Sequence, residues 1–157
     1  MIGTLSQLVA AHFDSVYEGP NDDYPAVLEA LAGISAAQAA WKPGPENNSI
    51  WQITDHLTAS NVWLMEMLEK GQAASPIWTE PAGGDSAWLD SLAQLSATQA
   101  KLRAALLALT DEELLSVPVA EWKKTLLELL LSSAAHEACH AGQIDYLKGL
   151  APATSDQ

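Results

Sequence analysis

Apolar residues that recur every three or four positions are the feature that most constrains the fold of this chain. Ile2, Leu5, Val9 and Phe13 follow this spacing, and similar stripes recur three more times along the sequence. Such spacing gathers apolar side chains on one face of a helix, where they can pack against other helices. It predicts long helices over about residues 2–17, 50–70, 85–109 and 122–150. No segment alternates between apolar and polar residues as a half-buried strand does.

Capping residues mark two shorter helices between the first and second long ones. Asp23 can begin one that runs to Leu31, and a Ser-x-x-Gln capping box at 35–38 begins another. A second capping box, at 49–52, precedes the second long helix. The whole pattern predicts an all-α fold, a four-helix bundle with a long first crossover containing short helices.

Length and composition fit one domain. The chain has 157 residues, of which 48% are hydrophobic, and six tryptophans offer large apolar surfaces that a helical core can bury. We therefore expect a single helical domain over residues 1–150, followed by a flexible tail over 151–157.

The charge balance argues against polyanionic partners. Seven Lys plus Arg against twenty Asp plus Glu give a formal charge of −13, which would repel phosphate backbones and anionic lipid. We expect no nucleic acid and no membrane as partner. The sequence shows no secretory signal pattern and no apolar stretch long enough to span a bilayer, and its single cysteine suits a reducing compartment. These features predict a cytoplasmic protein.

Three histidines fall on the predicted inward faces of two helices. At 100° per residue, His136 and His140 share an arc of about 80° with Ile144 and other apolar residues of the last helix. His56 lies between Ser60 and Trp63 on the apolar arc of the second long helix, which also holds Leu64. Three inward imidazoles are costly to bury without partners, whereas three imidazole nitrogens can hold one divalent metal ion. His12, at the edge of the first helix's apolar face, is interpreted as a hydrogen-bonded core residue instead.

The segment His136-Glu137-Ala138-Cys139-His140 also matches the His-Glu-x-x-His pattern of zinc peptidases. A peptidase of that kind takes its third ligand from downstream, but no His or Glu follows His140, so the upstream His56 fits a bundle better. Glu137 is a candidate catalytic residue as general base, a further ligand or a partner for an imidazole; otherwise it is a carboxylate at the solvated rim. Cys139 falls on the far side of the helix and is a poor candidate for ligand or nucleophile.

Two segments carry a resemblance to a known family. The run Ser-Ile-Trp-Gln-Ile-Thr-Asp-His-Leu at 49–57, followed by His-Glu-Ala-Cys-His-Ala-Gly-Gln-Ile-Asp-Tyr-Leu at 136–147, resembles the DinB-like (DinB/YfiT) superfamily. The resemblance implies a four-helix bundle, often dimeric, in which His56, His136 and His140 hold nickel, zinc or a similar divalent ion. Characterised relatives include metal-dependent thiol S-transferases and an isomerase that use low-molecular-weight thiols. The resemblance thus implies a homodimer that acts on a small-molecule substrate.

Three imidazole ligands determine what such a site can do. They leave the charge of a divalent ion uncompensated and at least one coordination position open. An activated water there would give hydrolysis, and a bound thiolate would give S-transfer or thiol-assisted isomerisation. The alternative from another class is a non-catalytic metal- or ligand-binding bundle, a sensor or an interaction module, with its site closed by His12 or Glu137.

Overall fold

The computed structural model describes residues 3–119, 121 and 123–152, and in this part of the chain the fold is helical, with no strand. Met1, Ile2 and most of the expected tail, residues 153–157, lie outside it. Within the same residues, no helix has the length and apolar character that crossing a bilayer requires. The all-α expectation is confirmed.

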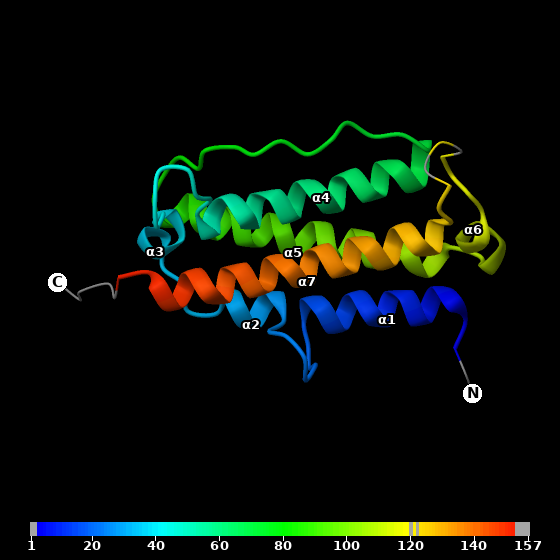
Figure 1. Ribbon diagram of the computed structural model, residues 1–157, viewed down its shortest axis with the longest axis horizontal. Helices are drawn as coiled ribbons and strands as arrows, with labels where there is room; N and C mark the ends of the chain where they lie inside the picture. The colour runs from blue at the N-terminus through cyan, green and yellow to red at the C-terminus, as the bar shows by residue number, and fades with distance from the viewer. Residues whose placement is uncertain (1–2, 120, 122, 153–157) are drawn as a thin grey trace.

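Four long helices lie side by side and enclose the core (Figure 1). α7 contacts both α1 and α4, and α5 contacts the same two helices from the other side. Their bounds are α1 Leu5–Tyr17, α4 Ile50–Lys70, α5 Asp85–Ala108 and α7 Leu126–Leu150.

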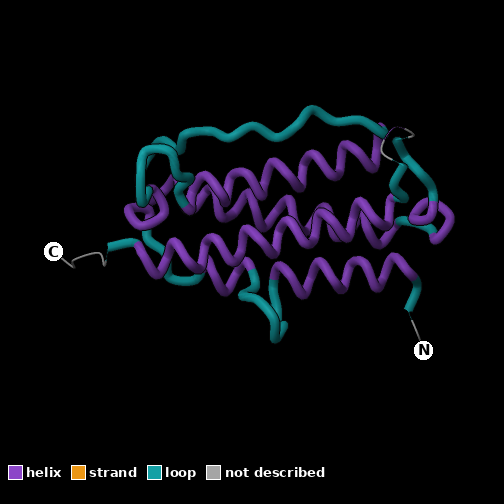
Figure 2. Tube along the Cα trace, viewed as in Figure 1, coloured by secondary structure: helices purple, strands orange, loops and turns teal. Residues whose placement is uncertain are grey.

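The long crossover is the second connection and not the first, which corrects the expected topology. Asn61 pairs with Gln99, and Trp51, ten residues earlier in α4, pairs with Ser91, earlier in α5, so the two helices run in the same direction. The chain must therefore return along the molecule between them. Residues 71–84 make this return as an extended strap over α4 (Figure 2).

The first connection holds two short helices, as the capping residues predict. They are α2 Val27–Leu31 and α3 Ala36–Ala40, and α3 begins after the expected capping box. Asp23 does not begin α2, because the backbone there is held in a turn by Asn21, whose Oδ1 accepts a hydrogen bond from the Tyr24 amide.

Two long helices begin later than expected because polar caps hold their first turns. α1 begins after Thr4, whose hydroxyl accepts from the Gln7 amide; the predicted start at Ile2 lies outside the described residues. α7 begins after Thr125, which forms a capping box with Glu128. The predicted start at Trp122 lies outside the described residues. α6 Asp111–Leu115 precedes this region at one end of the molecule.

The tryptophans divide between the core and the surface. Trp51 and Trp88 are buried, with ring centroids 5.4 Å apart. Trp78, on the strap, is 42% exposed and so does not serve the core as expected. The strap is anchored by Glu80, which accepts hydrogen bonds from Lys42 Nζ at 2.8 Å and Gln52 Nε2 at 3.0 Å.

Candidate metal centre

The structure brings His56, His136 and His140 together between α4 and α7. Each offers one ring nitrogen, and these three atoms lie within 4.8 Å of one another. His136 Nε2 is 2.9 Å from His140 Nε2 and 3.4 Å from His56 Nε2. His136 and His140 are one helical turn apart on α7, and α4 crosses that turn with His56 facing it.

The face of α7 that packs against the core differs from the predicted arc. His140 is only 7% exposed, but His136 is exposed and His56 is half-buried. The buried arc is centred near Glu137, because α7 packs on α1 and α2 as well as on α4. His136 therefore lies at the edge of the core face, where an ion could reach it.

Neighbouring side chains orient two of the imidazoles. His140 Nδ1 donates a hydrogen bond to Gln143 Oε1 at 2.7 Å, which leaves the lone pair of Nε2 for the cluster. The Trp78 indole stacks on the His56 ring, with centroids 4.1 Å apart and planes 8° from parallel. His56 Nδ1 is buried and has no hydrogen-bond partner among the described residues.

The pKa of each of the three imidazoles is lowered, which favours the neutral form that binds metals. Burial, together with the neighbouring His140 and His136, lowers the pKa of His56 to about 4. Partial desolvation of its ring, with a smaller contribution from His140, lowers the pKa of His136, and burial lowers that of His140. Neutral imidazoles offer their lone pairs without competition from protons near neutral pH.

The spacing of the nitrogens fits a metal ion. Tetrahedral coordination at 2.0–2.1 Å places ligand nitrogens about 3.3 Å apart, and the two distances in the cluster, 2.9 and 3.4 Å, bracket that value. Three imidazoles are a donor set for a divalent transition-metal ion. Of the described residues, only these three histidines form such a group, so Glu137 and His12 are not part of it.

Glu137 is neither a ligand in this cluster nor a carboxylate at the solvated rim. Its side chain is only 3% exposed, and its Oε1 has no hydrogen-bond partner among the described residues. Burial raises the pKa of its carboxyl to about 8. The interpretation of Glu137 as a carboxylate at the solvated rim was wrong, because α7 packs on α1 and α2 as well as on α4 and so buries this side chain.

Two other residues outside the cluster are exposed. His12 is exposed on α1 because the buried residues of that helix, such as Val9, Phe13 and Val16, define a face that excludes it; its interpretation as a core residue was wrong. Cys139 is exposed on α7, away from the cluster, as expected.

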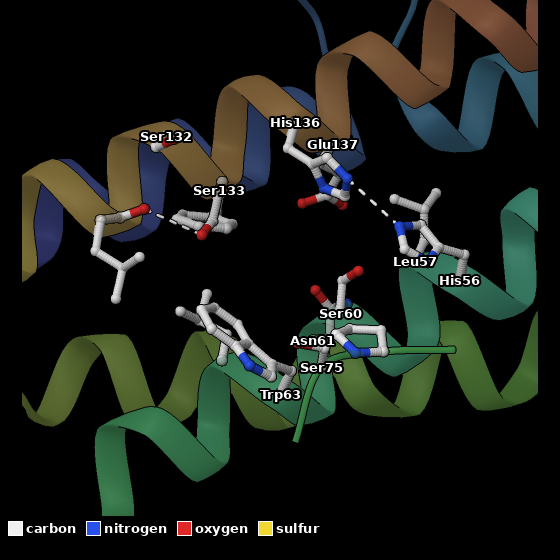
Figure 3. A pocket seen from close by; sticks show the side chains of 14 residues that line it. His56, Leu57, Ser60, Asn61, Trp63, Ser75, Ser132, Ser133, His136 and Glu137 are labelled. Carbon is white, nitrogen blue, oxygen red and sulfur yellow. Dashed lines mark hydrogen bonds between the residues drawn. The ribbon is translucent and has the colours of Figure 1, made fainter. Parts of the chain in front are cut away.

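A cavity of about 350 Å³ adjoins the histidines (Figure 3). Its apolar walls come from α1, α4, α7 and the strap, and its polar lining comprises four serines, Asn61, Glu137 and two of the histidines. The apolar wall residues are Phe13, Leu57, Trp63, Leu64, Pro76 and Leu129.

Sequence reasoning missed the contribution of the strap. Ser75 and Pro76 line the cavity, and Trp78 covers His56 from the side of the strap. Residues 71–84 carry no periodic pattern, so only the parallel course of α4 and α5, which forces the return, could have indicated that this segment passes the site. Gln143 could have been found, since it follows His140 by one helical turn.

Comparison with known proteins assigns the family. No curated protein and no solved structure matches the chain. The family model of the DinB superfamily matches residues 22–144, which include all three histidines and most of the helical region. This chain belongs to the DinB superfamily.

Proposed function

We propose that this protein is a DinB-type four-helix bundle that holds one divalent metal ion through His56, His136 and His140 and acts as a metal-dependent enzyme on a small molecule. The observation that carries the proposal is the convergence of three neutral imidazoles, with nitrogens 2.9 and 3.4 Å apart, beside a cavity. The family membership supports it independently. Nickel and zinc are the ions we favour for this donor set.

An enzyme fits the site better than a closed metal-binding module. A structural zinc site has four protein ligands, whereas the cluster within the described residues has three. The cavity reaches two of the three histidines, so a substrate can approach an open coordination position from that side. Neither His12 nor Glu137 supplies the fourth ligand that the non-catalytic alternative requires.

The roles of individual residues follow from their positions. A bound divalent ion would supply Lewis acidity, able to activate a water for hydrolysis or hold a thiol as thiolate for S-transfer. Gln143 fixes the tautomer of His140, and Trp78 holds the His56 ring and shields it from water. Glu137 can hold or accept a proton inside the cavity, because its Oε1 is not committed to another group of the described chain.

Turnover is tested with metal-loaded protein and a panel of thiols paired with electrophilic acceptors, alongside ester and amide substrates. We expect turnover that is lost in His56→Ala and kept in His12→Ala, which removes an exposed histidine outside the cluster. An equal rate in His56→Ala would contradict the proposed role of the centre. A lack of turnover across the whole panel would favour the non-catalytic alternative.

We also propose that the protein is a homodimer in a reducing compartment such as the cytoplasm. The family resemblance supports the dimer, and the single, exposed cysteine fits a compartment where thiols stay reduced. Light scattering at micromolar concentration tests the dimer, and a monomer mass would contradict it.

A further inference from the structure

The charges around the cavity beside the histidines limit what it can bind. The chain has seven Lys and Arg residues, but none is among the cavity's lining residues, all of which belong to the described part of the chain. Several are engaged elsewhere: Lys42 with Glu80, Lys70 with Glu66 and Arg103 with Asp14. Apart from an ion held by the histidines, a carboxylate or phosphate on a ligand would therefore meet no positive charge in this cavity.

Glu137 is the only acidic residue that lines the cavity within the described chain. It is nine-tenths buried, and its Oε1 lacks a hydrogen-bond partner there. Buried polar atoms in folded proteins nearly always have partners, so an orphaned oxygen at a cavity wall points to a group that a ligand brings. Oε1 can accept a hydrogen bond whether the carboxyl is ionised or carries its proton on Oε2, so the matching group is an N–H or O–H donor.

The remaining walls define the body of that ligand. Phe13, Leu64 and Leu129 present apolar surface, and hydroxyl groups such as those of Ser132 and Ser133 are small and uncharged. Ser133 Oγ donates to the Leu129 carbonyl and so is already partnered. A volume of about 350 Å³ is at the lower end of the range for small-molecule sites.

We infer that this cavity selects small molecules with an apolar body and a hydrogen-bond donor, an amine or an alcohol, at the end that meets Glu137, and rejects molecules with a carboxylate or phosphate there. Glu137 is thereby the specificity-determining residue. The inference names the substrate class of the enzyme proposed above and rests on that proposal for catalysis. Selection by the cavity itself does not require the metal.

The test uses three probes with the same apolar body, 4-phenylbutylamine, 4-phenylbutan-1-ol and 4-phenylbutanoate. Binding is measured by NMR titration of the full chain at neutral pH, both zinc-loaded and after chelation. In the chelated protein we expect the amine and the alcohol to bind at least about tenfold more tightly than the acid. The shifted amides should include those of Leu129, Ser132 and Ser133.

Two isosteric variants test whether Glu137 causes the preference for the amine over the acid. Glu137→Gln should remove most of the preference for the amine over the acid. The matched control, Glu66→Gln, changes a carboxylate on α4 that pairs with Lys70 and does not line the cavity, and it should keep the preference.

The outcomes separate this inference from the proposed function. Equal or tighter binding of the acid by the chelated protein overturns the inference, and so does the absence of binding by all three probes at millimolar concentration. Metal analysis of the zinc-incubated samples reports separately on the metal centre. A protein that prefers the amine but takes up no zinc would support the cavity's selectivity and contradict the proposed enzyme.

Discussion

Two groups of buried polar side chains lie on α4 and its neighbours, and they differ in whether their hydrogen-bonding atoms are paired. Asn61 and Gln99, 6% and 5% exposed, satisfy each other through a 2.9 Å hydrogen bond between α4 and α5. Between α4 and α7, by contrast, His56 Nδ1 and Glu137 Oε1 are buried without partners among the described residues. Because unsatisfied buried groups are costly, the matched pair serves the fold and the unmatched groups indicate a site built for something else.

The largest effect should come from breaking the matched pair. Asn61→Ala leaves the Gln99 side chain buried without its partner and should lower the free energy of unfolding by about 1–3 kcal/mol. Glu137→Gln, at the unmatched site, should cost far less, because no hydrogen bond of the described chain is lost. Urea unfolding measures both variants. A greater loss of unfolding free energy in Glu137→Gln than in Asn61→Ala would contradict the claim that the Asn61–Gln99 pair stabilises the fold more than Glu137 does.

The pH dependence of stability should reveal the unmatched carboxyl in the metal-free protein. The pKa of His56 is lowered from 6.5 to about 4, so its stabilising contribution is complete above pH 6.5 and is lost as the pH falls through 4. The pKa of Glu137 is raised from 4.5 to about 8, so its contribution is complete below pH 4.5 and is lost as the pH rises through 8.

Between pH 6.5 and 8, only Glu137 of these two groups still binds its proton differently in the folded and unfolded states. The free energy of unfolding should therefore fall there by up to about 2 kcal/mol, at roughly 1.4 kcal/mol per pKa unit. Urea unfolding across this range measures the decline, and Glu137→Gln should flatten it. A decline of equal size in Glu137→Gln would assign it to other groups.

Trp78, on the strap, should strengthen metal binding because it holds the His56 ring in place. Trp78→Ala removes the ring stacked on His56 and should weaken metal affinity by about tenfold, the effect typical of residues that orient a ligand. Titration with zinc against a competing chelator measures the affinity. Ile77→Ala, which truncates a neighbouring side chain that is 75% exposed, is the control and should leave the affinity unchanged. Equal losses in both variants would mean that Trp78 has no specific role.

The smallest effect should come from the strap's anchor. Glu80→Gln weakens the contacts with Lys42 and Gln52. Because the Glu80 side chain itself is 74% exposed, we expect a loss of at most about 0.5 kcal/mol in the free energy of unfolding. Thermal unfolding of the variant measures this loss. A loss of several kcal/mol would mean that the strap is an integral part of the fold.

The sequence allowed the helices and the three histidines to be predicted because both depend on local rules. Capping boxes such as Ser49 with Gln52 placed the starts of α3 and α4 correctly. The i and i+4 spacing of His136 and His140 puts them on one side of α7 wherever that helix packs. Their convergence with His56 could be expected once α4 and α7 were taken as neighbours.

The rest depended on how helices pack, which periodicity alone does not give. The predicted arc centred the core face of α7 on the histidines, but contacts with α1 and α2 centre it on Glu137. The parallel course of α4 and α5 is fixed by contacts between residues far apart in sequence, such as Asn61 with Gln99. Local sequence patterns therefore could not predict that the strap and Trp78 lie at the site.

The most direct test of the account is the metal content of the protein purified without a histidine tag and incubated with zinc or nickel. The three-histidine site predicts about one ion per chain in the wild type and in His12→Ala, and a loss of stoichiometric metal in His140→Ala, which removes the most buried ligand. Absence of stoichiometric metal in the wild type, or full retention in His140→Ala, would contradict the central claim that His56, His136 and His140 form a metal centre.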